Sequence, residues 1–448
     1  AIDKILNEID KIVLNEQFEF LKSTVNEQVQ DNQISLTFNI EESEKFYVEK
    51  INIFGNNVTR EDVIRNNLAV DEGDAFNELL QAKSLINLKS LNFFSNVEAE
   101  IIDSKSQNNK IINISVEEKP TGEIMAGAGF GTSGGTVAIG VSENNFLGKG
   151  IELSSDLALG VDSLKGLISI NDPNYKGSNK SLNASIESSI TDKSDDFGYK
   201  TNKTGFSIGS GFEFYDDFYW NTGISSYVEK IETNSTASTK MKKQEGSYFD
   251  TYFNQTFSYD KRNQKYKTSN GYISRLTQNI PLISDSYTLT NGYDYKIYNQ
   301  WRDENIFSLG IHLKTTNALN EHNVKLSERL FLPTAKLRGF EGGKVGPKDG
   351  TDFIGGNYMS TINLATTLPQ ILPNFQNIDF SLFLDVANIW GVDYDSTLED
   401  DENIRSSIGI ALNLFTPVGP LNLSLSEAIS KGKNDITESF RFNLGTTF

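Results

Sequence analysis

The sequence of 448 residues predicts a mainly β protein, in which a transmembrane antiparallel β-barrel follows smaller α+β structure. Three observations predict this fold class. Residues 439–448 alternate bulky apolar with polar or small side chains and end on an aromatic residue, which is typical of the closing strand of a membrane barrel. Only 37% of residues are hydrophobic, and no stretch approaches the roughly 18 apolar residues of a helical span. From residue 121 onward, strand-like stretches alternate with Gly, Asn and Asp turns.

Residues 1–43 are expected to be part of an α+β domain whose start lies outside the sequence. Apolar side chains at helical spacing predict a helix over residues 2–14, and two short strands are predicted at 18–21 and 34–40. One helix and two strands form too small a core to stand alone. No signal peptide precedes this region, so we expect a mature chain or a fragment.

Residues 44–120 are predicted to form a complete α+β domain. The predicted order is strand, helix, helix, strand and strand, with the strands at 46–54, 97–102 and 111–116 and the second helix at about 76–91. Thr59 is expected to cap the first helix, with Asp62 as a weak capping-box partner. Pro120 ends the domain, because proline cannot continue a paired strand.

Residues 121–448 are long enough for a barrel of about 16 membrane-spanning strands with their connections. The clearest strand candidates are residues 151–159, 205–214, 379–388 and 421–425. Residues 332–357 are different, because this stretch is long, rich in glycine and charge, and too polar to span a bilayer. We expect it to be a long loop.

Composition excludes several functional classes. The net charge of −19 argues against nucleic acid as a partner, because phosphates select a basic surface. Cysteine is absent, and His312 and His322, the two histidines, do not lie at metal-ligand spacing with other candidates. No nucleophile elbow or phosphate loop is present. The sequence therefore predicts no enzyme activity, no metal and no cofactor.

Several motifs, in order, resemble the BamA family of outer-membrane protein assembly factors. Residues 337–340, Leu-Arg-Gly-Phe, resemble the V/L-R-G-F/Y signature of the sixth outer loop of that family. Residues 383–390 are similar to its F-x-D-x-G-x-x-W strand, although Ala387 stands where the family often has glycine. Residues 418–421 and 442–448 resemble its last two strands. Residues 46–119 look like a POTRA domain, and residues 1–42 look like the remainder of another.

The resemblance implies that the long loop folds into the barrel, where Arg338, followed by Gly339 and Phe340, meets Asp385. The plainer interpretation of Arg338 is a solvated loop arginine. Asp385 lies on the polar register of its strand, which favours the inward contact. In some relatives a glutamate also holds this arginine, but Ala365 stands at the corresponding position here.

The first and last barrel strands are predicted to form a weak lateral seam. Small residues make few cross-strand contacts, so a seam there could open and offer an edge to another strand. The plainer interpretation is a glycine-softened strand, which is common in barrels where neighbouring strands approach closely. The candidate seam residues of the first strand are Ile124, Met125, Ala126, Gly127, Ala128, Gly129 and Phe130, and those of the last are Phe440, Phe442, Leu444, Gly445 and Phe448.

The function implied by the resemblance is the folding and insertion of outer-membrane proteins through this seam. Expected partners are unfolded outer-membrane protein precursors, accessory assembly lipoproteins, a periplasmic chaperone and outer-membrane lipid. The barrel would lie in the outer membrane of a Gram-negative bacterium, with POTRA domains in the periplasm. Two alternatives remain: a two-partner secretion or translocation-assembly transporter with a polypeptide-conducting pore, and a diffusion porin.

Overall fold

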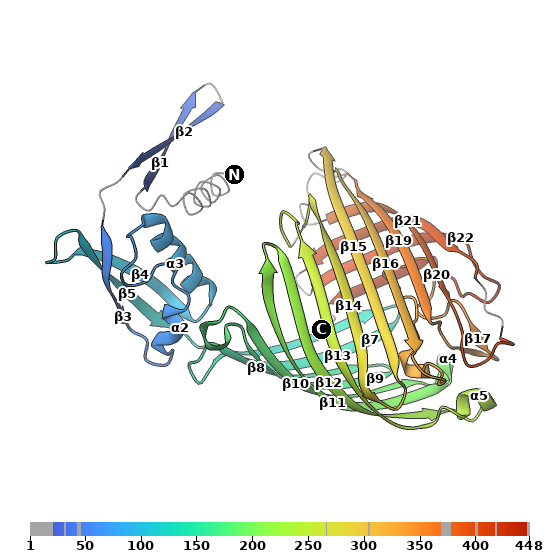
Figure 1. The fold of residues 1–448 in the computed structure, drawn as a ribbon. Coiled ribbons are helices and arrows are strands. Elements are labelled where there is room, and N and C mark those ends of the chain that lie inside the picture. Colours follow the sequence, from blue (N-terminus) through green and yellow to red (C-terminus); the bar gives the residue numbers. More distant parts are fainter. Residues whose placement is uncertain are drawn as a thin grey trace. The chain divides into compact units, whose positions relative to one another are not determined.

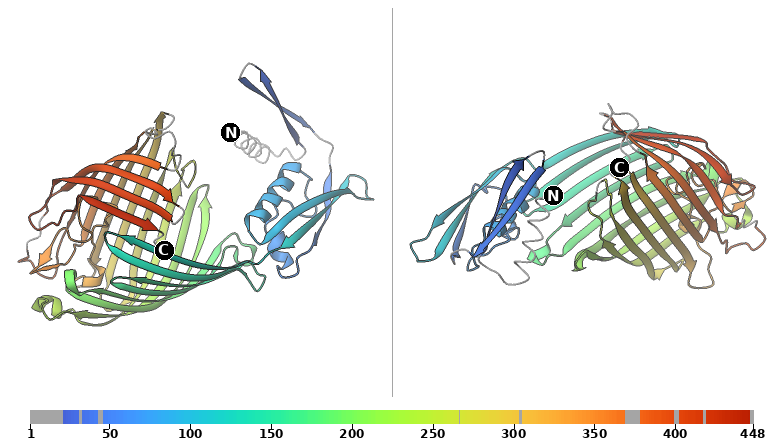
Figure 2. Two further views of the ribbon diagram at one scale, coloured as in Figure 1. Left: turned by 180° about the vertical axis from the view of Figure 1, so that it is seen from behind. Right: turned by 90° about the horizontal axis from the view of Figure 1, so that it is seen from above.

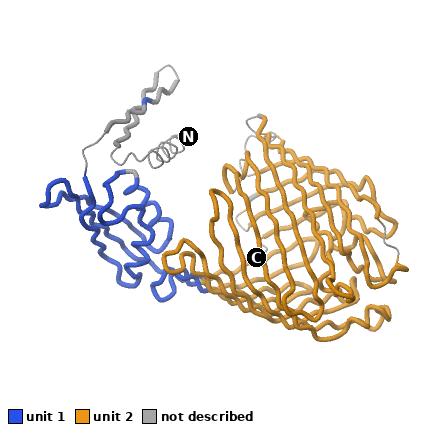
Figure 3. The backbone as a smooth tube through the Cα atoms, in the orientation of Figure 1, with its two compact units in different colours: residues 1–123, 143–153 blue, residues 124–142, 154–448 orange. Residues whose placement is uncertain are grey.

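The computed structural model of the chain describes residues 21–30, 33–42, 46–265, 267–302, 305–368, 378–398, 402–416 and 419–445. Two compact units are present, one formed by residues 1–123 and 143–153 and the other by residues 124–142 and 154–448 (Figure 3). The helix predicted over residues 2–14 lies outside the described residues, as does most of the strand predicted at 18–21.

The first unit contains a hairpin and an α+β domain. The hairpin pairs β1 (Leu21–Gln30) with β2 (Gln33–Glu42), which includes the strand predicted at 34–40. In the domain, β5 lies between β3, which is parallel to it, and β4, which is antiparallel. Two helices lie on one face of this sheet (Figure 1). The elements follow the predicted order: β3 (Tyr47–Phe54), α2 (Glu61–Arg65), α3 (Glu78–Ser90), β4 (Phe94–Asp103) and β5 (Asn109–Glu118).

The helix cap predicted at Thr59 is wrong. Helix α2 begins at Glu61, and its cap position, Arg60, makes no side-chain cap hydrogen bond. A carboxylate from the end of β5 instead binds the backbone before the helix: Glu118 accepts N–H bonds from residues 57, 58 and 59, the last at 2.6 Å. Burial acts to raise the pKa of Glu118, but these backbone hydrogen bonds outweigh it and hold the pKa below its ordinary value.

Sixteen strands of the described residues close into an antiparallel barrel (Figures 1 and 2). The predicted strands 151–159, 205–214, 379–388 and 421–425 lie in β8, β11, β20 and β22. The barrel strands are β6 (Gly122–Gly131), β7 (Gly134–Phe146), β8 (Ile151–Gly160), β9 (Ser163–Asp172), β10 (Ser181–Lys193), β11 (Tyr199–Tyr215), β12 (Phe218–Thr233), β13 (Gly246–Asp260), β14 (Gly271–Ser284), β15 (Thr288–Arg302), β16 (Asn305–Ala318), β19 (Tyr358–Thr367), β20 (Ile378–Trp390), β21 (Arg405–Thr416), β22 (Gly419–Ser430) and β23 (Phe440–Gly445).

The connections of the barrel carry little regular structure of their own. No helix in the described part of the chain is long and apolar enough to cross a bilayer. The short elements of the connections are η1 (Tyr175–Gly177), α4 (Ser194–Phe197), α5 (Thr239–Lys242), η2 (Leu326–Glu328), β17 (Lys348–Asp349) and β18 (Asp352–Phe353).

Alternation along the strands separates two chemical environments. In β11, Phe206 and Ile208 are exposed, whereas Ser207 between them bonds Ser185 of β10 through its hydroxyl at 2.8 Å. Similar polar contacts join Gln255 to the neighbouring strand β14. An apolar outer face and a hydrogen-bonded polar inner face are what a barrel needs when lipid lies outside and water inside.

We predict that Glu118→Gln loosens the segment before α2. The amide loses the negative charge that three backbone N–H groups share, so hydrogen exchange at residues 57–59 should rise about tenfold at neutral pH. Because the pKa of Glu118 is lowered in the folded state, this stabilisation is fully present above pH 4.5. It is lost as the pH falls through the folded-state pKa. The difference between the two proteins should therefore vanish in acid. Glu117→Gln, the exposed neighbour, is the control, and equal exchange in all three proteins would contradict the prediction.

Candidate functional site

The connection between β16 and β19, residues 319–357, folds against the inner wall of the barrel, and we call it the inner loop. It contains the predicted loop 332–357. Its apolar side chains form a buried cluster with Met359 of β19 and with Ala387 and Ile389 of β20. These three residues alternate with outward-facing positions such as the exposed Leu382, so the inner loop packs on the luminal face. The loop members of the cluster are Leu330, Leu332, Leu337, Phe340 and Val345.

Arg338 and Asp385 are brought together in a bidentate ion pair. The Nε and Nη2 atoms of Arg338 each lie 2.7 Å from a different carboxylate oxygen of Asp385, and the Arg338 backbone N–H donates to the same carboxylate at 3.1 Å. Asp385 is 0% exposed. The guanidinium carbon lies 3.4 Å from the ring centroid of Phe383, two residues earlier on the same face. The pair is therefore stacked and oriented, and its carboxylate is shielded from water.

Asn363 of β19 completes this pair, and the sequence reasoning missed it. It lies directly opposite Asp385 in the strand register, and its amide donates to Asp385 at 2.8 Å and to the backbone oxygen of Lys336 at 2.7 Å. Ala365 pairs with Phe383, two residues along β20 on the same face. An uncharged amide thus provides a second contact to the carboxylate in this chain.

Gly339 and Phe340 follow Arg338 in the predicted motif. Each lies at a position in the loop tip that requires its residue type. Gly339 has φ +89°, and a Cβ there would lie 3.1 Å from Ser407 and 3.3 Å from the Ser426 hydroxyl. Only glycine combines this backbone conformation with such a close approach. Phe340 is 1% exposed and forms a bridge with Thr437, in the connection between β22 and β23.

The start of the inner loop has a second set of buried ion pairs that the sequence analysis did not identify. Lys325, 4% exposed, lies 3.1 Å from Glu229 of β12 and 2.5 Å from Asp250 of β13. Arg329 pairs with Asp393, beyond β20, and donates to Asn357 at 3.0 Å. The inner loop is consequently fixed at its start to β12 and β13, and at its tip to β20.

The seam between the first and last strands is short. In the described residues, β23 pairs with β6 at three positions: Asn443 with Gly131, Leu444 with Phe130, and Gly445 with Gly129. By contrast, β11 and β12 pair along their whole lengths. Gly445 has φ +97°, and a Cβ there would lie 2.2 Å from the backbone oxygen of Ala128. Gly445 is the last residue of the chain that the structure describes.

The remaining predicted seam residues of β6 come before the three residues of this strand that pair with β23. Ile124 is 82% exposed, and Met125, Ala126 and Ala128 are also exposed, while Gly127 is half-buried. On β23 the ring of Phe442 lies between Phe440, at 6.2 Å, and Phe130 of β6, at 5.8 Å. Phe448 lies outside the described residues.

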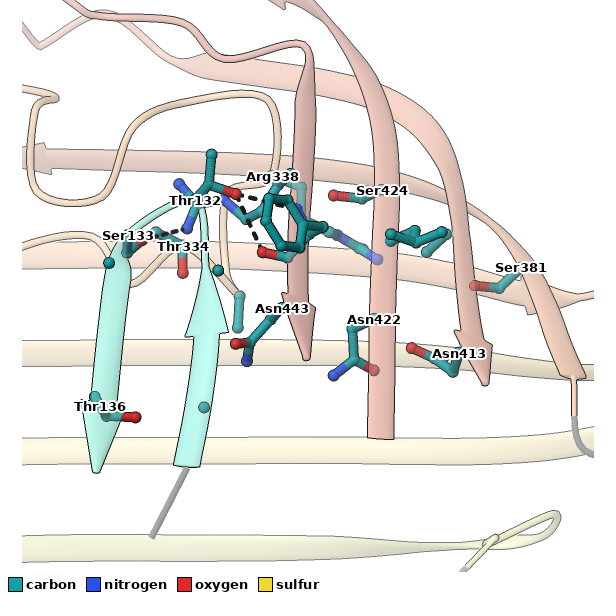
Figure 4. A pocket seen from close by; sticks show the side chains of 18 residues that line it. Thr132, Ser133, Thr136, Thr334, Arg338, Ser381, Asn413, Asn422, Ser424 and Asn443 are labelled. Carbon is teal, nitrogen blue, oxygen red and sulfur yellow. Dashed lines mark hydrogen bonds between the residues drawn. The ribbon is translucent and has the colours of Figure 1, made fainter. Parts of the chain in front are cut away.

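Side chains of the turn between β6 and β7 make further contacts with β23, next to the paired residues. The Thr132 hydroxyl donates to the Phe442 backbone oxygen at 3.1 Å and accepts from the Phe442 N–H at 3.0 Å. Arg441 donates to the Ser133 hydroxyl at 2.9 Å. Behind these contacts lies a polar cavity of about 460 Å³, which Arg338 also lines (Figure 4). The loop pair and the seam therefore face one luminal space.

Two family models match the chain. The model described as the Omp85 superfamily domain matches residues 145–448. The POTRA model, described as a surface antigen variable number repeat, matches residues 46–119.

Individual proteins share the same architecture. An outer membrane protein assembly factor BamA from Neorickettsia risticii is 24% identical over 97% of this chain and 60% of its own length. The crystal structure of BamA from Haemophilus ducreyi lacking POTRA domains 1–3 has a TM-score of 0.81 at 24% identity, covering 96% of this chain and 90% of that one. CdiB from Acinetobacter baumannii has a TM-score of 0.57 at 13% identity, covering 98% and 82%. The chain thus spans about 60% of the length of that curated relative.

We predict that Asp385→Asn releases the loop tip. Breaking a buried pair while its partner stays in place costs about 3–5 kcal/mol, so Arg338 should leave its site. Trypsin should then cleave after Lys336 or Lys344 much faster than in the original protein. Asp379→Asn is a matched control, because it makes the same change on the same strand at a carboxylate that is 46% exposed and 3.7 Å from Lys267. Unchanged protection in Asp385→Asn would contradict the prediction.

Proposed function

Since this chain belongs to the Omp85 superfamily, we propose that it is the core component of an outer-membrane protein assembly machine and works without enzyme chemistry. It folds and inserts barrel proteins through the seam between β6 and β23. The observation that carries the proposal is the pairing of these two strands at only three positions of the described residues. Relatives named outer membrane protein assembly factor BamA support the same function.

The seam would act by exposing the backbone edge of β6 to a precursor strand. When β23 separates from β6, the freed backbone groups of β6 need new partners, because the bilayer core offers no water to replace them. An extended precursor strand satisfies them by β-augmentation. The glycines of β6 let that strand approach closely, as Gly131 already does with Phe442, where a Cβ would lie 2.6 Å from the backbone oxygen. No nucleotide is needed, since burying lipid-facing side chains is downhill.

Strand length supports insertion on the same side of the barrel. Strands β6, β8 and β9 have 10 residues each and β7 has 13, whereas β11 has 17 and β12 has 16. At about 3.3 Å per residue, the barrel wall beside the seam is much lower than the wall at β11 and β12. A low wall forces nearby lipid to thin, which weakens the bilayer where a precursor would enter.

The proposal also assigns partners to the seam, to the outer face of the barrel and to the POTRA domain. Unfolded outer-membrane protein precursors bind the seam, and outer-membrane lipid surrounds the apolar outer face. The barrel lies in the outer membrane of a Gram-negative bacterium, and the POTRA domain lies in the periplasm. There, an edge strand such as β4, which borders its sheet, offers a surface for precursors, accessory lipoproteins or a periplasmic chaperone.

Conductance separates this proposal from a transporter or porin. Because the inner loop is fixed to two walls of the barrel, single channels should be small and flickering. Asp385→Asn should raise the conductance by releasing the tip, and Asp379→Asn should not. Wide, steady currents from the original protein in planar bilayers would favour a conducting pore.

The direct test is insertion of an unfolded barrel protein into liposomes that contain this chain. We expect insertion to fall to the rate of empty liposomes when Phe130→Cys and Leu444→Cys lock the seam, and to recover with reductant. These residues are direct register partners, and the chain has no other cysteine. The control pair, Leu309→Cys with Leu364→Cys, joins partners in the long β16–β19 ladder and should leave insertion unchanged. Normal insertion through a locked seam would refute the seam mechanism.

A further inference from the structure

We propose that the connection between β22 and β23, residues 431–439, is a clasp through which the loop tip positions the last strand, with Asp435 as the positioning residue. This inference rests on the proposed role of the seam and extends it, because it assigns control of the seam to the inner loop. The loop tip is defined here as residues 337–346.

The clasp and the loop tip form a small antiparallel ladder. Glu341 donates its N–H to Ile436 at 3.0 Å, and Ile436 donates to Lys344 at 3.0 Å. Glu438 donates its N–H to the Gly339 oxygen at 3.0 Å, and Phe340 bridges Thr437 between them. All these hydrogen bonds join backbone groups, and none of them involves a side chain. The clasp is therefore paired to the loop tip through the main chain.

Asp435 fixes this ladder to the barrel wall. Its carboxylate accepts from Arg405 of β21 at 2.9 and 3.3 Å, and both side chains are 1% exposed. The same carboxylate accepts the backbone N–H of Gly346 at 3.0 Å and that of Gly432 at 2.5 Å. One buried acid thus binds the wall, the loop tip and its own turn. Its loss breaks the buried ion pair between β21 and the clasp.

From the clasp, contacts continue across the seam. Glu438, whose backbone holds Gly339, pairs through its carboxylate with Arg441 of β23. Arg441 in turn donates to Ser133, in the turn after β6. A continuous path therefore runs from the loop tip through Glu438 and Arg441 to the first strand. In the described residues β23 meets β6 at three register positions, so this path adds a further link that aligns the last strand.

The inference predicts that loosening the clasp opens the seam even when the barrel stays folded. Disulfide formation between Phe130→Cys and Leu444→Cys reports the closed seam, without reference to insertion activity. Adding Asp435→Asn should lower the disulfide yield at least about threefold, since a buried charge pair is broken. The heat-modifiable gel mobility of the full chain in detergent shows that each variant keeps its barrel.

Asp393→Asn is the matched control, because it breaks the Arg329 pair at the start of the inner loop and does not touch the clasp. It should leave the disulfide yield unchanged. If Asp435→Asn fails to fold, Ile436→Pro gives the same test, since it removes the N–H that binds Lys344 while its side chain is exposed. The inference is overturned if the folded clasp variant keeps the original yield, or if Asp393→Asn lowers the yield equally. Neither result depends on whether the chain inserts precursors.

Discussion

The fully buried carboxylate of Asp385 is the constraint on which the luminal arrangement depends. An isolated charge in that position would be very costly, so it requires partners on every side. The ion pair with Arg338 and the amide of Asn363 supply them, and the stack of Arg338 on Phe383 holds the guanidinium plane. These partners come from a loop and two neighbouring strands. The burial of one carboxylate thus determines where a long, polar loop must sit.

The placement of the loop in turn organises the rest of the lumen. Its start is held by charges on β12 and β13, and its tip is held by β20 and by the connection before β23. The inner loop therefore links β12, β13 and β20 to the connection that leads into β23.

The sequence predicted the barrel well because alternation reports which face of a strand meets lipid. It underestimated the length of strands such as β11. The first residues of that strand, starting at Tyr199, are mostly polar and lie outside the apolar alternation. Arg338 and Asp385 could be selected because motif and register agreed. Asn363, Lys325 and Asp435 could not, since their roles depend on cross-strand register or on partners far away in the chain. The role of Glu118 could not be predicted for the same reason, because its backbone partners lie about 60 residues earlier in the chain.

Thr132 shows how a closure can be selective for shape and indifferent to sequence. Its hydroxyl acts as donor and acceptor toward the main chain of Phe442, and the side chain of the opposite strand takes no part in either bond. Any residue other than proline presents the same two groups. Thr132 can therefore make both bonds whatever side chain the opposite residue carries, so this contact sets the position of the strand and places no demand on its sequence.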